Sequence, residues 1–188
     1  MSRYVDQMPA EEPVGRCVVL PGTGYVPDAP LLFLVGQLAL AHGWAVRQVW
    51  WTPPDIEDGA EAAWVAGELD AALAEPFDGV GDRTLVVGKS LGTAGAARAA
   101  ELKLPAIWLT PLLTYSDLAA PLLRYPTAQL VVIGEGDRYL DRDVLGVLPG
   151  RHALVPGDHA MLVPGEPFAT WQAHREVMAA VDGWLAQL

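Results

Sequence analysis

Six short β-rich runs separated by helix-like patterns constrain the fold of this 188-residue chain more than any other feature. The runs are rich in valine, isoleucine and leucine and lie at residues 17–20, 45–51, 84–87, 106–109, 130–133 and 152–155. Several of the runs are continuous and not alternating, which is typical of strands that are buried on both faces, as in a parallel sheet. Between them apolar residues recur at helical spacing, as at Leu31, Leu34, Val35 and Leu38. The sequence therefore predicts an α/β fold, with a doubly wound, mainly parallel sheet of about six strands and helices on both faces.

Length and composition favour one globular domain in a soluble protein. The chain has a typical domain length, and its hydrophobic content of 52% supplies a core. We expect residues 15–188 to form this domain and the polar residues 1–14 to form a flexible N-terminal arm. The arm has no signal-peptide core, and no run approaches the roughly 18 apolar residues of a membrane span, so we expect a cytoplasmic protein without a membrane partner. The formal net charge of −11 also argues against nucleic-acid binding.

The stretch "LVVGKSLGTAG", residues 85–95, contains two overlapping motifs that imply different chemistry. Gly-Lys-Ser would end a phosphate-binding loop, but the glycine required five residues before Gly88 is Arg83, and the residues between belong to a predicted strand. A flavodoxin-like nucleotide binder, the alternative architecture, would need a Ser/Thr-rich loop after the first strand, and "PGTGYVPD" lacks one. Both observations argue against a phosphate site.

Gly-x-Ser-x-Gly, the second motif, fits its surroundings. The predicted strand ends in Gly88-Lys89-Ser90-Leu91-Gly92, and a helix rich in small residues follows. A nucleophile elbow needs this order of strand, sharp turn and helix, with small neighbours two residues before and after the serine. Ser90 is therefore a candidate nucleophile, whereas Lys89 is expected to be solvated.

A nucleophilic serine needs a base and an acid that orients the base. Because ligands of such folds bind at the carboxyl ends of the strands, the candidates for these roles are the residues that follow each run. Asp137 follows residues 130–133 in "GEGD", and His159 follows residues 152–155 in "PGDH". The fallback acids are Glu135, Asp141 and Asp143, and Asp158 is expected to shape its loop. The other histidines are weaker candidates: His152 begins its strand, His42 ends the first helix, and His174 lies in the last helix, where we expect it to be solvated.

With these motifs, "GKSLG", "GEGD" and "PGDH", the sequence resembles a small, lidless member of the α/β-hydrolase superfamily from about residue 17 to the end. The resemblance implies a Ser90–His159–Asp137 triad, no cap domain between residues 109 and 130, and none of the first antiparallel strands of larger members. It also implies an oxyanion hole formed by the amide of Leu91 and an amide of the loop after the first strand, with Thr23 or Gly24 favoured over Tyr25.

The expected function is hydrolysis of a small-molecule carboxylic ester or thioester through an acyl-enzyme, without a metal or an organic cofactor. A thioesterase, lactonase or acyltransferase on the same scaffold, or a non-catalytic binding module, remains the alternative, because a fold does not fix a substrate. Large apolar residues that follow strands are candidates for the substrate pocket: Tyr25, Trp50, Trp51, Leu112, Leu113 and Met161. Cys17 lies within an apolar run and is expected to be a buried structural thiol.

Overall fold

The computed structural model describes residues 3–188, and within them seven strands form one sheet in the order β1-β3-β2-β4-β5-β6-β7. Strands β2 to β7 run parallel, and β1 pairs antiparallel with β3. The predicted doubly wound, mainly parallel sheet is confirmed, with one strand more than the six expected. The strands are β1 (Arg3–Gln7), β2 (Gly15–Leu20), β3 (Trp44–Trp50), β4 (Thr84–Lys89), β5 (Ala106–Leu109), β6 (Gln129–Gly134) and β7 (Arg151–Val155).

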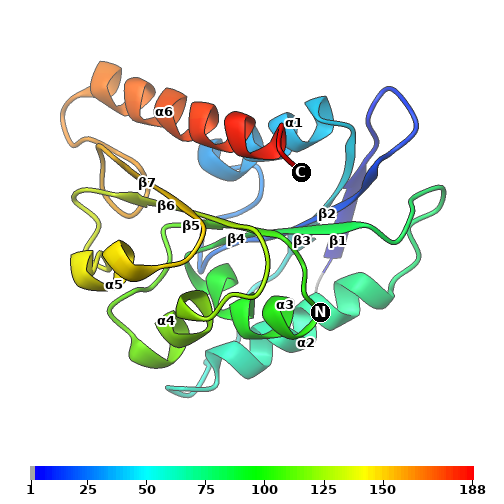
Figure 1. Ribbon diagram of the computed structural model, residues 1–188, viewed down its shortest axis with the longest axis horizontal. Helices are drawn as coiled ribbons and strands as arrows, with labels where there is room; N and C mark the ends of the chain where they lie inside the picture. Colours follow the sequence, from blue (N-terminus) through cyan, green and yellow to red (C-terminus); the bar gives the residue numbers. More distant parts are fainter. Residues whose placement is uncertain (1–2) are drawn as a thin grey trace.

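Helices cover both faces of this sheet (Figure 1). One face carries α1 (Pro30–Ala41) and α6 (Pro167–Leu185), and the other carries the remaining four helices. These are α2 (Glu61–Ala74), α3 (Ala96–Glu101), α4 (Ser116–Leu123) and α5 (Arg142–Val147), and a 3₁₀ turn, Ser90–Gly95, precedes α3. None of the described helices is long and apolar enough to span a membrane.

The core has two halves because successive side chains of a strand point to opposite faces. Val18 and Val86 pack with α2 to α5, whereas Val19 and Val87 pack with α1 and α6. Both faces are covered, which is why the central strands are continuous apolar runs. Cys17 lies in the second half, fully buried, and burial raises the pKa of its thiol to about 12, so it is a structural thiol as predicted.

The N-terminal segment corrects two expectations, that residues 1–14 form a flexible arm and that the chain lacks a first antiparallel strand. Residues 3–7 of the predicted flexible arm form β1, an antiparallel first strand, and residues 1 and 2 lie outside the described part of the chain. Arg47 of β3, only 1% exposed, binds both carboxylate oxygens of Asp6 in β1, at 2.8 and 2.7 Å. Its guanidinium also donates to the carbonyls of Ala72, Glu75 and Pro76. A buried cation thus holds this polar strand against the sheet.

The carboxyl ends of the parallel strands remain open. Between β5 and β6 the chain forms only the short helix α4, so no cap domain covers this edge. The loops after β2, β4, β6 and β7 meet there.

Candidate active site

Ser90 lies at the sharp turn between β4 and the 3₁₀ turn that follows, with a φ of 52°. A positive φ is uncommon for a residue with a side chain and marks strain that the surroundings must hold in place. The flanking glycines explain how the turn fits. A Cβ on Gly92 would collide with the carbonyl oxygen of Leu20, and one on Gly88 would lie 2.7 Å from the Trp108 ring. The sequence forms this elbow because only glycine permits these approaches.

Ser90, His159 and Asp137 form one chain of hydrogen bonds. Nε2 of His159 lies 2.8 Å from Oγ of Ser90, and Nδ1 lies 3.0 and 2.9 Å from the two carboxylate oxygens of Asp137. Since an ionised carboxylate only accepts, Nδ1 carries the proton that it donates to Asp137, and Nε2 accepts from the Ser90 hydroxyl. The Asp137 side chain has no exposed surface, while that of His159 is 23% exposed. The arrangement can take a proton from a serine at the floor of an open site.

The loops after β6 and β7 hold the acid and the base in place. The amide of Gly136 donates to the carbonyl of Gly157 at 2.9 Å, which joins the two loops. Asp158 Oδ1 accepts from the amides of Ala160 and Leu162, so this carboxylate shapes the histidine loop as expected.

The fallback acids lie elsewhere. Asp141 caps α5 by accepting from the amides of Asp143 and Val144. Glu135 and Asp143 are exposed side chains. Of the four acids considered, Asp137 is the one that contacts His159.

His174 was expected to be solvated, but it is buried, with 8% exposure, against the sheet side of α6. Its Nδ1 lies 2.9 Å from the Thr170 carbonyl one turn earlier. The expectation failed because α6 places this position on its inner face. His42 pairs with Asp182 of α6, and His152 is exposed in β7.

Lys89 was also expected to be solvated and is instead 2% exposed. Its Nζ donates to the carbonyl oxygen of His159 at 3.1 Å and lies 4.5 Å from the centre of the Tyr25 ring. Burial lowers the pKa of this amine to about 8, against the opposing effect of the Asp137 and Asp158 carboxylates.

An open cavity of about 930 Å³ lies over Ser90 and His159. Its floor includes Thr23 and Leu91, two of the three residues predicted to supply oxyanion amides. Gly24, the third, adopts a φ of 66° in the same loop. The walls come from the segments that follow β3, β5 and β6, including the first residues of α2 and α4: Pro53, Pro54, Asp55, Ile56, Asp58, Gly59, Glu61, Leu112, Tyr115, Asp117, Leu118, Arg138 and Tyr139.

Leu112 is the one predicted pocket residue among these lining residues. Leu113 and Met161 are fully buried in the core. The others make contacts outside the cavity lining: Trp51 donates to the Gly22 carbonyl and packs on Trp64, Trp50 donates to Gln48, and the Tyr25 ring lies against Lys89.

The residues missed by the sequence analysis lie mostly in the stretch that follows β3, "TPPDIEDGAE". Its position at the carboxyl end of a strand was a usable signal, although its residue types indicate no particular chemistry. Tyr139 was also missed; its ring meets the edge of the His159 ring at a centroid distance of 4.8 Å, and its amide donates to Asp137.

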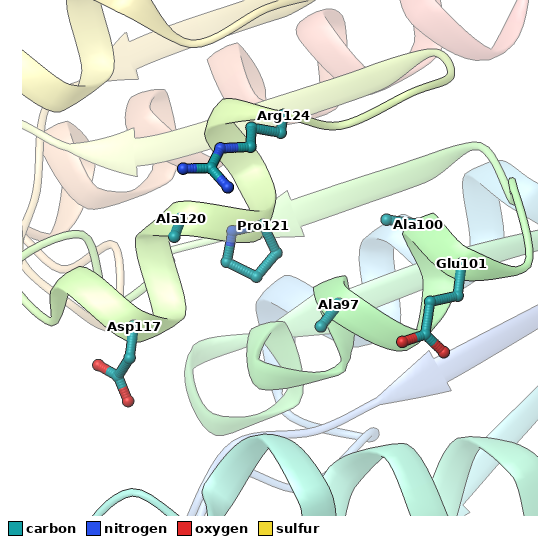
Figure 2. Close-up of a pocket in the computed structure, with 7 residues that line it drawn as sticks. All are labelled: Ala97, Ala100, Glu101, Asp117, Ala120, Pro121 and Arg124. Carbon is teal, nitrogen blue, oxygen red and sulfur yellow. The ribbon is translucent and has the colours of Figure 1, made fainter.

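A second, smaller cavity of about 300 Å³ lies between α3 and α4 (Figure 2). Alanine side chains line its middle, and the charged groups of Glu101, Asp117 and Arg124 lie at its sides. It contains no member of the Ser90–His159–Asp137 chain.

No protein-family model and no curated protein matches the sequence. Solved structures do match. Est1E from Butyrivibrio proteoclasticus, solved with ferulic acid bound, matches with a TM-score of 0.75 at 14% identity, over 99% of this chain and 94% of that chain. Dienelactone hydrolase from Anabaena variabilis matches with a TM-score of 0.73 at 18% identity, over 99% and 91%. An α/β serine hydrolase without a lid from Xanthomonas campestris matches with a TM-score of 0.65 at 14% identity, over 99% and 88%. The chain therefore has the α/β-hydrolase fold in a minimal form without a lid.

Proposed function

We propose that this protein is a serine hydrolase that cleaves small carboxylic esters or thioesters through a covalent acyl-enzyme. The observation that carries the proposal is the hydrogen-bonded chain Ser90–His159–Asp137, with 2.8 Å between the serine and the imidazole. An activated serine needs a base within hydrogen-bonding reach and a third group that orients the base. All three groups follow strands at the open edge of the sheet, where the cavity gives a substrate access to Ser90.

In the first half of the proposed reaction, Nε2 of His159 takes the hydroxyl proton as Oγ of Ser90 bonds to the carbonyl carbon. The carbonyl π electrons move to the oxygen and form an oxyanion. Asp137 keeps the imidazole in the correct tautomer and stabilises the imidazolium. When the oxyanion collapses, the bond to the alcohol or thiol breaks, and the leaving group takes the proton from His159.

In the second half, a water molecule gives a proton to His159 and attacks the acyl carbon. The bond to Ser90 then breaks, the serine regains its proton from His159, and the acid leaves. The charges and protons return to their starting places, so the cycle needs no other reactant.

The oxyanion would be held by backbone amides. Leu91 follows the serine in the 3₁₀ turn, and Thr23 lies across the floor of the cavity; both line it beside Ser90. We assign the oxyanion hole to the Leu91 amide and an amide of the 23–24 loop. Loss of one such donor typically costs about 10²- to 10³-fold in turnover.

The cavity walls favour a substrate with an apolar or aromatic group. Tyr115, Tyr139, Ile56 and Leu112 supply flat or apolar surface on three walls. A compact ester fits a cavity of about 930 Å³ without movement of a lid. Structural likeness to Est1E, which was solved with ferulic acid, and to a dienelactone hydrolase supports a hydrolase of small carbonyl compounds.

The test is labelling with a fluorophosphonate probe followed by peptide mass spectrometry. The probe reacts with activated serines, and the sequence contains three serines, Ser2, Ser90 and Ser116. We expect an adduct on Ser90, lost in Ser90→Ala and retained in Ser116→Ala, together with hydrolysis of p-nitrophenyl acetate that follows the same pattern.

A folded wild-type protein that forms no adduct and hydrolyses no member of an ester and thioester panel would overturn the proposal. Circular dichroism of each variant shows whether the fold is intact. Hydrolysis that persists in Ser90→Ala would also contradict it, because it would place the chemistry at another residue.

A further inference from the structure

Lys89 is a buried amine that the proposed mechanism does not use. Burying an ammonium is costly unless the protein replaces its lost hydration. No carboxylate of the described residues lies within 4.0 Å of its Nζ, and the side chain is 2% exposed. A methionine of similar size would fill the space without this cost, so the position of the amine itself needs a reason.

The contacts of Lys89 join three loops. The residue belongs to the elbow and precedes Ser90. Its Nζ donates to the His159 carbonyl oxygen at 3.1 Å, which ties it to the loop after β7. The Tyr25 ring, 4.5 Å away, belongs to the loop after β2. In that loop a Cβ placed on Gly22 would lie 3.5 Å from Cδ of Lys89 and 3.1 Å from Cβ of Ser90.

These three loops carry the serine, the histidine and the 23–24 amides assigned to the oxyanion hole. We propose that Lys89 is a positioning residue, whose buried ammonium holds the His159 loop and the β2–α1 loop against the elbow. Hydrogen bonds from charged donors are stronger and shorter than neutral ones, so the ammonium fixes the backbone of His159 more firmly than an uncharged side chain could. This inference rests on the function proposed above.

If Lys89 has this role, the turnover number should depend on whether the amine is protonated. The charged and titratable groups that face the amine are Asp137 after β6, Asp158 and His159 after β7, and Tyr25. The two carboxylates favour the ammonium and burial opposes it, which brings its pKa to about 8. Above this pH the amine loses its charge, its attraction to the Tyr25 ring and the stronger form of its hydrogen bond. The turnover number should therefore fall as the pH rises through about 8, because the loop is held less firmly.

The experiment compares kcat and KM for p-nitrophenyl acetate from pH 6 to 10 in the wild type, Lys89→Met, Lys89→Gln, Lys89→Arg and Lys103→Met. We expect Lys89→Met and Lys89→Gln to lower kcat about 10- to 100-fold, the range for loss of a charged hydrogen bond, with KM changed less than about threefold. They should also lack the decline near pH 8. Lys89→Arg keeps the charge at all these pH values and should move the decline upward. Lys103, the only other lysine of the sequence, is exposed, and its variant should behave as the wild type.

A titration that does not depend on activity completes the test. In protein labelled with ¹³C-lysine, two lysine signals are expected, and Lys103→Met assigns them. The midpoint measured for Lys89 should coincide with the alkaline midpoint of kcat. A wild-type kcat and pH profile in folded Lys89→Met or Lys89→Gln would overturn the inference, as would a Lys89 midpoint that differs from the kinetic one. A wild type inert to the fluorophosphonate probe would instead overturn the function on which the inference rests.

Discussion

Nδ1 of His159 lies 3.0 and 2.9 Å from the two carboxylate oxygens of Asp137, and the Asp137 side chain has no surface exposed to solvent. The contact fixes which ring nitrogen carries the proton and leaves the other facing Ser90. The buried carboxylate of Asp137 is therefore placed to orient the imidazole of His159.

Asp137→Asn should therefore abolish most of the activity while the protein stays folded. An amide of the same shape can donate to Nδ1 and so favours the wrong tautomer, and the comparable change in a serine protease triad costs about 10⁴-fold in kcat. Steady-state hydrolysis of p-nitrophenyl acetate measures the effect. Glu135→Gln removes a charge from the same loop at an exposed position and serves as the matched control. Equal losses in both variants would mean that charge, and not orientation, matters.

Gly92→Ala should destabilise the fold strongly, because its Cβ would collide with the backbone oxygen of Leu20 and would lie 2.8 Å from that of Pro21. Backbone atoms cannot turn aside as a flexible side chain can, so we expect a loss of more than about 2 kcal/mol in the free energy of unfolding. Urea denaturation measures this loss.

Gly183→Ala is the control for that measurement. Nothing lies within 4 Å of a Cβ at this position in α6. Alanine is favoured over glycine within a helix, so this variant should gain up to about 1 kcal/mol. If Gly92→Ala were as stable as Gly183→Ala, the close packing of the elbow would be refuted.

Lys89→Met should make the protein more stable at pH 7, although less active. The amine has a pKa of about 8 in the folded chain, against the 10.5 of an unperturbed lysine. Below pH 8 the folded state holds a buried charge at a cost, and each pH unit between the two pKa values is worth about 1.4 kcal/mol. The gain should thus reach roughly 3 kcal/mol at most.

The difference in stability between Lys89→Met and the wild type should decrease as the pH rises. As the pH rises from 8 towards 10.5, the folded wild type loses the proton while the unfolded chain keeps it, so the wild type gains stability and the advantage of Lys89→Met shrinks. Urea unfolding of both proteins at pH 7, 8.5 and 10 measures the difference. A less stable Lys89→Met at pH 7 would show that the lysine is kept for stability.

Esters with a negative charge should be poor substrates. Asp55, Asp58, Glu61 and Asp117 line the cavity, and Arg138 is the one guanidinium among its lining residues. A cleft lined mainly by one sign of charge repels ligands of that sign, and salt screens the effect over about 10 Å at 0.1 M. For matched phenyl acetates carrying a trimethylammonium group, no charge or a carboxylate, we expect kcat/KM to fall in that order at low salt, by about 10-fold from first to last.

The variants Asp55→Asn and Asp117→Asn should reduce the difference in kcat/KM between the cationic and the anionic ester, and 0.5 M NaCl should also reduce it. Asp82→Asn, which changes a residue just before β4 at the opposite end of the sheet, should leave it unchanged. Preference for the carboxylate ester in the wild type would contradict the prediction.

Much of the fold could be predicted because the buried strands consist largely of apolar residues. Residues 85–87 and 130–133 are apolar throughout, since helices cover both faces of the sheet. The hydrogen-bonded grouping of Ser90, Asp137 and His159 could be predicted for a related reason: each residue follows a strand, and parallel strands end at the same edge.

What escaped prediction depends on contacts between distant segments. The polar sequence of β1 becomes a strand only because β3 offers it an edge and Arg47 offers Asp6 a partner. Lysine is rarely buried, so nothing local to Lys89 indicates its place under the His159 loop. Met161 lies two residues after His159 in the sequence, yet the turn after His159 directs it into the core.

The antiparallel strand β1 also protects the protein against self-association through the edge of its sheet. The outer strand of a sheet presents unpaired N–H and C=O groups that can pair with a second molecule. Without residues 3–7, that outer strand would be β3, which is longer and almost entirely buried in the present fold. The short, charged β1 takes its place at the boundary. A shortened chain starting at residue 15 would thus be prone to self-association through β3, even with Ser90, His159 and Asp137 all present.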